Sequence, residues 1–415
     1  MLHHLSLLLL VSLPFGSSFS QPLLPIGLSQ HLSRLCATSW SDVEGILAAP
    51  LGASLPVSID TVLQPEKPTF STEHPTLYRE RHGWCPYSER VWLTLELFDI
   101  PYDTIRVDNT GGPRPSYFAG QTPQMRWPEG KTQGESMDLV YALNDRYKCQ
   151  LEEDRDIVAA FRNIFPRARP SSRAAYLFQY NGEPLWRSTF EKTLEGTNAL
   201  LGESSGPFLG GDDFSAADIA WAPFLERYRY QLPCLHKGLD PEAYPNLAAW
   251  YQAMDQIPAY ACRVKGDAAS WSKVLSMAGF GNSGVPPEID ANMERLKKQQ
   301  EVIRQDVWEE YARDRPHVAA TPAAEAALTI VRNRGPIVKD AIKRSTEANW
   351  KDLPNLPKTP EDIEAALHDL ALTLIAEQDP TPTARALASF LNDRMCVPRD
   401  MGAMSAACIQ SIANS

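Results

Sequence analysis

Apolar positions between residues 76 and 147 follow two different periods, which predicts a mixture of strands and helices. Residues 103–107 alternate between apolar and polar side chains, as a half-buried strand does. Pro86 opens a stretch with apolar side chains at helical spacing, and its missing N–H costs nothing in a first helical turn. The predicted elements are strand 76–79, helix 86–98, strand 103–107 and helix 135–147. Their order predicts a βαβ unit with a further helix.

From residue 154 to about 280 the apolar spacing is helical throughout. The predicted helices are 154–165, 173–180, 189–201, 216–230 and 245–256. Ser215 is the predicted N-cap of the fourth, and Asp218 is placed to complete a capping box with it. This stretch therefore predicts an all-α domain.

Residues 281–287 are rich in glycine and proline and predict a linker. Beyond it, a helical extension over 281–415 is predicted, with Thr-Pro pairs that suit helix starts at 321, 359 and 381. Residues 288–313 predict one long charged helix, and Asp400 is the predicted N-cap of the last helix. The pattern of the extension indicates no function.

The first 41 residues contain neither Asp nor Glu. Their apolar run is too short to span a bilayer and suits a signal peptide, with small residues before a cut at Phe19 and a Ser-rich, acid-free stretch after it. Residues 1–41 thus resemble the bipartite presequences of algae with secondary plastids, which implies import into the plastid stroma. Secretion is the alternative. Residues 42–75 are Pro-rich and are predicted to form an extended lead-in.

The amino-acid composition limits which kinds of binding partner are expected. Hydrophobic residues make up 43% of the chain, which is ordinary for a folded protein, and 40 Lys and Arg against 51 Asp and Glu give a net charge of −11. This balance argues against binding nucleic acid or anionic lipid, and no later segment is apolar for long enough to enter a membrane. Seven cysteines are too few for a disulfide scaffold and favour a reducing compartment. Cys36 is expected to leave with the presequence. The cysteines predicted to be structural, with no metal-ligand spacing, are Cys149, Cys234, Cys262, Cys396 and Cys408.

One cysteine stands where a predicted strand is followed by a helix. Cys85 comes directly before Pro86, so free N–H groups and the positive end of the helix dipole favour its thiolate. Cysteines in such positions have pKa values of about 3.5–7.5 instead of about 8.5. Ser88 stands where a dithiol motif has its second cysteine, so the site is predicted to be monothiol and to need an outside thiol for resolution. His82 and Arg90 are candidate helpers. The alternative is that Cys85 is a small buried apolar residue.

Four short motifs, taken in order, resemble the glutathione S-transferase superfamily. They are Cys-Pro-Tyr-Ser-Glu-Arg-Val-Trp at 85–92, Thr122-Pro123, Glu135-Ser136 and the predicted capping box at 215–218. The cysteine-type members are the most similar: omega, lambda, dehydroascorbate reductase and iota-like forms. Pro123 and Glu135 stand 12 positions apart, as in omega-type members. The resemblance covers residues 76–280, and iota-like forms have extra segments outside that core.

The resemblance implies an α/β thioredoxin-like N-terminal domain over 76–150 and an all-α glutathione S-transferase C-terminal domain over 151–280. An extra all-α C-terminal extension follows, and glutathione lies in the cleft between the two domains. Cys85 is the implied nucleophile. The implied glutathione-binding residues are Pro86, Tyr87, Thr122, Pro123, Glu135 and Ser136. Thr122 precedes a cis proline and pairs with the glutathione main chain, while Glu135 and Ser136 hold the γ-glutamyl end at a helix N-terminus.

Some of these residues have plainer interpretations. Glu135-Ser136 suits a simple helix cap, and Thr122-Pro123 suits an ordinary trans turn. Asn109 stands where omega-type members have a lysine for the glycyl carboxylate, and Arg106 or Arg114 is the candidate substitute. Four aromatic residues are candidates for a second-substrate site or, more simply, for core packing: Tyr176, Phe178, Trp186 and Phe190.

Two functions are consistent with the sequence. The first is a glutathione-dependent thiol transferase or reductase that acts on a small electrophilic or disulfide substrate through Cys85, with glutathione as co-substrate and no metal, as a monomer or homodimer. Conjugation through a hydroxyl is the lesser variant, with Tyr78 as its candidate. The second is a non-catalytic scaffold that docks a plastid partner through its helical extension.

Overall fold

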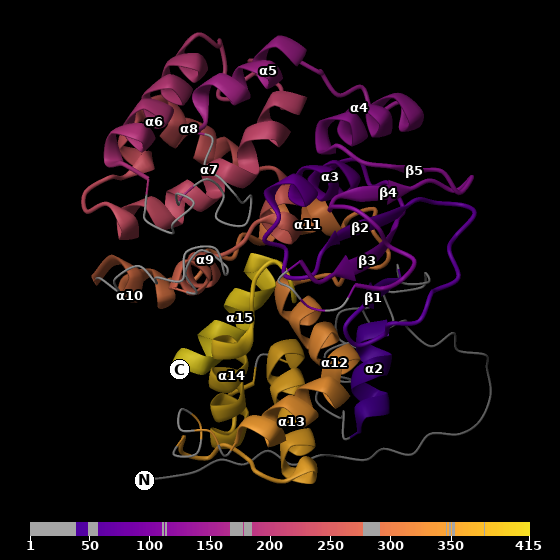
Figure 1. Ribbon diagram of the computed structural model, residues 1–415. Helices are drawn as coiled ribbons and strands as arrows, with labels where there is room; N and C mark the ends of the chain where they lie inside the picture. Colours follow the sequence, from indigo (N-terminus) through magenta and orange to yellow (C-terminus); the bar gives the residue numbers. More distant parts are fainter. Residues whose placement is uncertain are drawn as a thin grey trace, which may run out of the picture.

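The computed structural model describes residues 39–48, 57–109, 112, 114–166, 177, 185–276, 291–345, 347, 350, 353–376 and 378–415. Figure 1 shows two bodies: an upper one that contains the sheet and the helices after it, and a lower one made of helices from both ends of the described chain.

Five strands form one sheet in the order β1-β3-β2-β4-β5. Their bounds are β1 Ser58–Asp60, β2 Thr76–Glu80, β3 Asp103–Val107, β4 Gln124–Arg126 and β5 Thr132–Gln133. The first three strands in this order run parallel, β4 is antiparallel to β2, and β5 is antiparallel to β4. Helix α3 (Pro86–Leu97) connects β2 to β3, and α4 (Ser136–Tyr147) follows β5. The predicted βαβ unit and the thioredoxin-like domain are confirmed.

Alternate residues of β2 point to opposite faces of the sheet. Leu77 is fully buried in the large cluster that includes α3. Tyr78 joins a small cluster on the other face, where its ring stacks on Phe118 with centroids 5.2 Å apart. The nucleophile candidate at the start of α3 and the Tyr78 hydroxyl are therefore attached to opposite faces.

Helices of the all-α domain follow the thioredoxin-like domain. They are α5 Arg155–Ile164, α6 Arg187–Gly202, α7 Ala216–Leu235, α8 Pro245–Met254, the π-helix η3 Tyr260–Val264 and α9 Ala268–Ser276, with the short 3₁₀ turn η2 Pro241–Ala243. Four of the five predicted helices are confirmed, and α7 runs five residues further than predicted. The fifth, over 173–180, lies outside the described residues except for Leu177.

The capping box at the start of α7 forms as predicted. Ser215 Oγ accepts a hydrogen bond from the N–H of Ala217, and the Asp218 carboxylate accepts one from the N–H of Ser215 at 2.9 Å. Asp218 also accepts bonds from the Leu209 N–H and from Trp250 Nε1. Burial raises the pKa of Asp218, because the charged form loses water there. The box is structural and ties α7 to α8.

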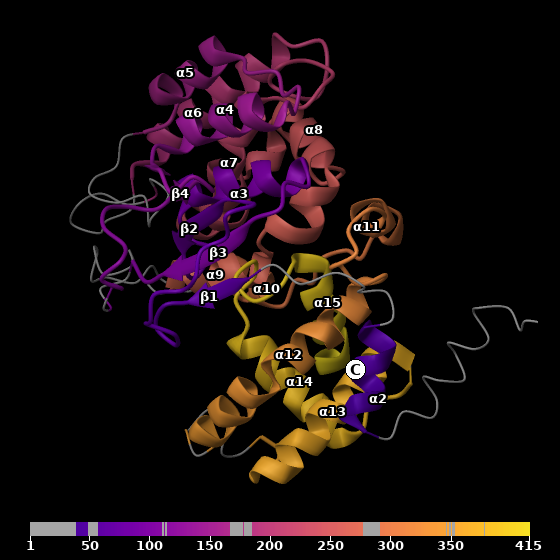
Figure 2. The ribbon, with the colours of Figure 1, turned by 90° about the vertical axis from the view of Figure 1, so that its right-hand side faces the viewer.

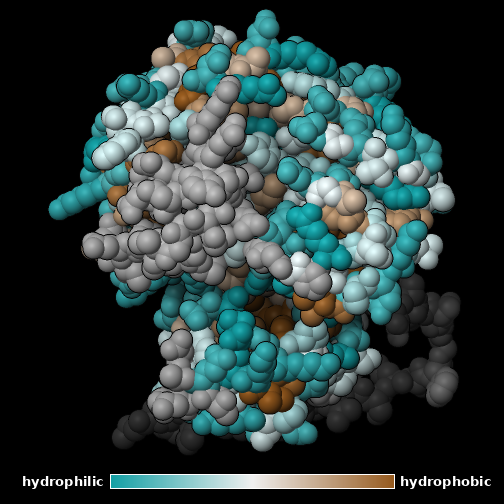
Figure 3. All heavy atoms as spheres, viewed as in Figure 1, coloured by the Kyte–Doolittle hydropathy of each residue, from teal (hydrophilic) through white to brown (hydrophobic). Residues whose placement is uncertain are grey.

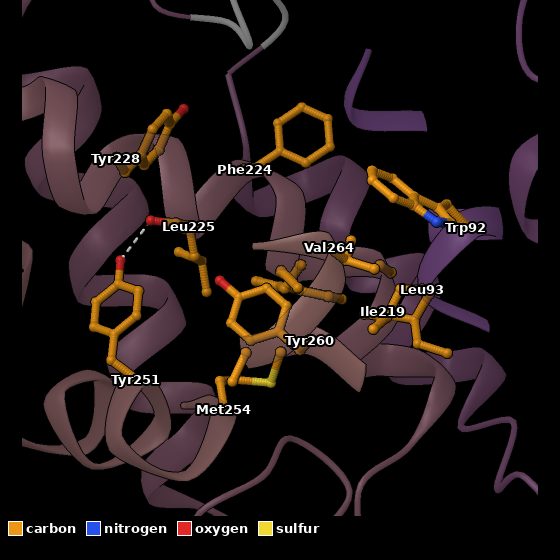
Figure 4. Packing of buried hydrophobic residues seen from close by; sticks show 14 of the residues in the cluster. Trp92, Leu93, Ile219, Phe224, Leu225, Tyr228, Tyr251, Met254, Tyr260 and Val264 are labelled. Atoms are coloured by element: carbon orange, nitrogen blue, oxygen red, sulfur yellow. Dashed lines mark hydrogen bonds between the residues drawn. The ribbon is translucent and has the colours of Figure 1, made fainter. Parts of the chain in front are cut away.

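The first and larger hydrophobic cluster, called the main core here, joins the thioredoxin-like and all-α domains. Figure 4 shows Trp92 and Leu93 of α3 beside Phe224 and Leu225 of α7 and Tyr260 of η3. In the same view the Tyr251 hydroxyl donates to the Leu225 carbonyl at 2.7 Å. Because α3 also carries Cys85 at its start, the main core fixes the helix on which the site depends.

The long charged helix predicted over 288–313 is wrong. Two short helices stand there instead, α10 (Ala291–Lys297) and α11 (Gln305–Ala312). Their apolar residues, among them Leu296 and Trp308, belong to the main core. Each short helix therefore contributes its own apolar side chains to that core. The predicted linker at 281–287 lies outside the described residues.

A second hydrophobic cluster forms the lower body, called the tail bundle here. It contains α2 Trp40–Ala48, α12 Pro322–Arg344, α13 Pro360–Ala376, α14 Pro382–Arg394 and α15 Ala403–Asn414. Helices α12, α13 and α14 begin at the three Thr-Pro pairs, as predicted. Figure 2 shows α2 lying against α12 and α13.

Helix α2 corrects two expectations about the start of the chain. Val43 and Leu47 are buried in the tail bundle, so residues 42–75 are not simply extended, and β1 adds a strand to the same stretch. The predicted end of the presequence at residue 41 falls inside α2. The remaining presequence, residues 1–38, lies outside the described residues. Amphipathic pairing with helices 280 residues away is a tertiary effect that local pattern did not reveal.

Asp400 does not cap the last helix, which is a further correction. The N-cap of α15 is Gly402, and the Asp400 carboxylate instead accepts from the Cys396 N–H at 3.0 Å and pairs with Arg399. Asp400 therefore closes the turn before α15.

The face shown in Figure 3 is mostly hydrophilic, and apolar side chains come into view in the hollow between the two bodies. Among the described residues, the helices are too short or too polar to cross a membrane.

Candidate functional site

Cys85 occupies the N-cap position of α3, with extended backbone angles of φ −75° and ψ 111°. Its side chain makes no capping bond, and Pro86 follows in the first turn as predicted. Cys85 Sγ lies 3.7 Å from the carbonyl oxygen of Thr122. The residue is buried, with 9% of its surface exposed, and its sulfur lies beside polar backbone rather than only among apolar side chains.

The loop opposite Cys85 contains the cis peptide bond predicted between Thr122 and Pro123. Within the described part of the chain, the Thr122 N–H donates to no acceptor, which leaves it available to a peptide lying alongside. Asn109 Nδ2 donates to Thr122 Oγ1 at 2.6 Å, and Arg114 donates to Asn109 Oδ1 at 2.9 Å. Asn109 thus positions Thr122, and Arg114 is the cation that stands nearby.

Glu135 and Ser136 begin α4 in an unusual backbone geometry. Glu135 has φ 65°, a region that costs energy for a residue with a side chain, and its carboxylate makes no capping bond. The Glu135 side chain is exposed, so the interpretation as a simple side-chain cap is not supported. Ser136 is buried, and Arg90 Nη1 lies 3.4 Å from its Oγ. A free carboxylate beside a helix N-terminus suits an amino acid end group, which carries both an ammonium and a carboxylate.

Arg90 joins the two domains beneath the site. Its guanidinium donates to the Ala220 carbonyl of α7 at 2.7 and 3.1 Å and lies over the rings of Tyr87, Phe161 and Phe224. Tyr87 packs edge-on against Phe224. Arg90 therefore serves as a domain contact, with its tip near Ser136.

Three other residues that the sequence suggested for the site do not contact Cys85 in the structure. His82 Nδ1 lies 2.6 Å from Glu80 Oε1, and its ring stacks on Trp84. Arg106 lies on β3 among Asp60, Arg81 and Asp400 and makes no contact with Thr122. Tyr78 is buried on the far face of the sheet, and this burial raises its pKa to about 12. The hydroxyl variant of the chemistry is therefore not supported by Tyr78.

The aromatic candidates for a second-substrate site divide in two. Phe190 is fully buried in the main core, as core packing predicts, whereas Trp186 is 74% exposed. Tyr176 and Phe178 lie outside the described residues. A cavity of about 320 Å³ lies between α5 and α6, and none of the glutathione-binding candidates lines it.

Sequence reasoning missed Arg227, a buried cation of α7. Arg227 Nη1 lies 2.8 Å from Glu89 Oε2, with both side chains 2% exposed, and its Nη2 donates to the Trp84 carbonyl at 3.1 Å. Burial raises the pKa of Glu89, and the Arg227 charge acts against that rise. The available signal was a cation next to Glu226 within a helix rich in apolar residues, because charged residues are rarely buried unless they are paired.

Six cysteines are free in the described residues, and no group of three or more metal-ligating side chains occurs there. Cys85 alone among them stands at a helix N-cap. Cys36 lies outside the described residues.

Two known protein domains match consecutive parts of this chain. Residues 84–146 match the glutathione S-transferase N-terminal domain, and residues 154–253 match the C-terminal domain of that family. Glutathione S-transferase L1 of Arabidopsis thaliana is 29% identical over 185 residues, which are 42% of this chain and 76% of that protein. Glutathione S-transferase DHAR2 of the same plant is 25% identical over 177 residues, covering 41% and 80% of the two chains.

Among solved structures, glutathione transferase Omega 3C from Trametes versicolor aligns with 22% identity and a TM-score of 0.37. The alignment covers 47% of this chain and 84% of that one. The two matched domains are consecutive in this chain, and the site lies where they meet. Residues 84–253 therefore contain consecutive N-terminal and C-terminal domains of the glutathione S-transferase type.

Proposed function

We propose that this protein is a glutathione-dependent thiol transferase or reductase in which Cys85 is the nucleophile. The family uses glutathione as a co-substrate, and the relatives include lambda-type transferases and dehydroascorbate reductases. The observation that carries the proposal is Cys85 Sγ at the start of α3, 3.7 Å from the Thr122 carbonyl that precedes the cis proline. The thiol stands at the N-terminus of α3, and on the loop opposite it the Thr122 N–H is unpaired among the described residues.

The residues present fit glutathione as a bound group. The Thr122 N–H offers a backbone partner, the Glu135 carboxylate suits an ammonium, and the N-terminus of α4 suits a carboxylate. Arg114 is the candidate for the glycyl carboxylate, since it stands beside Asn109 and Thr122. Tyr87 and Pro86 shape the wall next to Cys85.

The proposed chemistry has two exchange steps. The Cys85 thiolate attacks the glutathione sulfur of a glutathionylated substrate, forms the Cys85–glutathione disulfide and releases the substrate thiolate. A second glutathione thiolate attacks that mixed disulfide, which regenerates the Cys85 thiolate and releases oxidised glutathione. Ser88 replaces a resolving cysteine, so the second step depends on the outside thiol.

These steps apply to glutathionylated protein thiols. With a glutathionylated quinone in its hydroquinone form, the first step breaks the bond from sulfur to the ring carbon, and that carbon takes up a proton. With dehydroascorbate, the Cys85 thiolate adds to a carbonyl carbon, and one glutathione attacks the Cys85 sulfur and releases ascorbate. A second glutathione then restores the thiolate and leaves as oxidised glutathione.

The test is turnover of a small glutathione mixed disulfide by the full chain and by Cys85→Ser. We expect turnover by the full chain and a loss of at least about a hundredfold in Cys85→Ser, since the hydroxyl is a far weaker nucleophile. Equal rates in the two proteins, or none in either, would favour the scaffold alternative.

The proposed plastid location rests on residues 1–41 alone. A fluorescent reporter fused behind these residues and expressed in an alga with a secondary plastid tests it, and we expect stromal fluorescence. Fluorescence in the medium would favour secretion.

A further inference from the structure

We propose that the turn before α15, residues 395–402, positions the loop that carries Cys85, so that the tail bundle is a working part of the catalytic site. The inference rests on the proposed function, because it takes Cys85 as the reacting group. The observations that support it are the contacts of Trp84, the residue immediately before Cys85.

Three parts of the chain hold Trp84. Its N–H donates to Glu80 Oε2 at 2.8 Å within the thioredoxin-like domain. Its carbonyl accepts from Arg227 of α7 in the all-α domain at 3.1 Å. Its indole Nε1 donates to Cys396 Sγ in the turn before α15 at 3.3 Å. Each of these contacts restricts a different part of the same residue, and the last comes from 312 residues further along the chain.

The neighbours of Trp84 meet the same turn. Gly83 has φ +75°, and a Cβ built there would stand 3.3 Å from Pro398 Cγ, so backbone and proline ring approach closely. His82 stacks on the Trp84 ring with centroids 4.3 Å apart. Residues 82–84 therefore pack as one unit against residues 396–398.

The turn is itself anchored independently of the site. The Val397 N–H donates to Ser270 Oγ at 2.8 Å, and Lys273 Nζ donates to the Asn392 carbonyl at 2.7 Å. A Cβ at Gly402 would overlap the Cys262 carbonyl, which shows how tightly the turn lies on η3. Because α9 and η3 belong to the main core, the turn is a fixed support for Trp84.

The support matters for reactivity because Trp84 sets the direction of the next residue. Moving a reacting group by about 1 Å lowers the rate of reaction by as much as about a hundredfold. Burial raises the pKa of Cys396 to about 11, so this sulfur stays protonated near neutral pH and serves as a partner for the indole N–H. Cys396 is a positioning residue, because its sulfur accepts from the Trp84 indole and its N–H donates to Asp400, and neither contact is with Cys85.

The experiment compares Cys396→Ala, Cys396→Ser and Cys408→Ala in the full chain. Cys408 is the matched control, a cysteine of the same bundle whose Sγ bonds to its own helix at Met404. Two quantities are measured: kcat and KM with the glutathione mixed disulfide, and the rate of Cys85 alkylation by iodoacetamide, read from the Cys85 peptide by mass spectrometry.

We expect Cys396→Ala to lower kcat and the Cys85 alkylation rate by about three- to tenfold with an unchanged KM for glutathione, since a net hydrogen bond is worth about that factor. Cys396→Ser keeps a polar partner and should restore most of the rate, and Cys408→Ala should match the wild type. The double variant Trp84→Phe/Cys396→Ala should be no slower than Trp84→Phe alone, because the two residues act through the same contact.

The inference is overturned if Cys396→Ala keeps wild-type kcat and alkylation, if Cys396→Ser is as slow as Cys396→Ala, or if Cys408→Ala loses as much. Absence of turnover in the wild type would instead refute the proposed function. The alkylation rates still decide the positioning role in that event, because they need no substrate turnover.

Discussion

The main core and the tail bundle are both largely helical, but they are held together differently. The main core encloses charged side chains, such as the Glu89–Arg227 pair and Lys265 with its partner Glu301. The tail bundle is packed mainly from aliphatic side chains, and ion pairs such as Arg344–Asp340 lie at its surface. A buried carboxylate of α12, Glu325, accepts from the Ala319 N–H and lies beside Arg263 of η3. Buried polar contacts are directional and apolar contacts are not. The part that contains the candidate site is thus the part with directional contacts inside.

The largest expected effect tests the charges of the main core. Arg227→Leu leaves Glu89 buried without its cation and should lower the free energy of unfolding by about 3–5 kcal/mol, measured by denaturant titration. The matched change in the tail bundle, Arg344→Leu, removes a partly exposed pair and should cost about 0–1 kcal/mol. Similar losses in the two variants would show that the contrast between the two regions is wrong.

The next effect tests apolar packing in the tail bundle. Leu370 is fully buried there, so Leu370→Ala should lower unfolding free energy by about 2–5 kcal/mol through lost contacts and the cavity left behind. Ile342, which is 36% exposed on α12, is the control, and Ile342→Ala should change stability by about 0.5 kcal/mol or less. Chemical denaturation followed by circular dichroism measures both. A loss below about 1 kcal/mol in Leu370→Ala would mean that this bundle is loosely packed.

A third effect concerns alkaline pH. Burial raises the pKa of Cys396 from 9.0 in the unfolded reference to about 11. Between these values the unfolded chain has released a proton that the folded chain retains, so stability falls as pH rises. We expect the wild type to lose about 1–3 kcal/mol more than Cys396→Ala between pH 8.5 and 11. Parallel stability curves for the two proteins across that range would contradict the burial of this thiol.

The smallest effect compares helix caps in the two regions. Ser215→Ala, in the buried capping box of α7, should cost about 1–2 kcal/mol, and Thr381→Ala, at the exposed start of α14, about 0.5–1 kcal/mol. Thermal melts of both variants measure the difference. A larger loss at Thr381 would reverse the order that burial predicts.

Much of the fold, and the placement of Cys85 at a helix start, was predictable because these features are local. Pro86 after Cys85, the Ser215–Asp218 box and the three Thr-Pro pairs each depend on residues within one turn of helix. The prediction of one long charged helix over 288–313 was wrong. Two short helices, α10 and α11, stand there, and their apolar residues pack in the main core. The prediction for Asp400 was wrong too, since its carboxylate closes a turn three residues before the helix does begin at Ala403.

By itself, the sequence determined helices α3 to α8, strands β2 and β3, where Cys85 stands on its helix, and which family motifs the chain contains, because short-range backbone and side-chain preferences decide these features. Only the tertiary structure decided that residues 40–48 join the last four helices, that Arg227 reaches Trp84, and that Cys396 lies against Trp84, the residue before Cys85. The Arg227–Trp84 contact joins residues 143 positions apart, and the Cys396–Trp84 contact joins residues 312 positions apart. Such contacts form when burial of whole helix faces brings distant segments together.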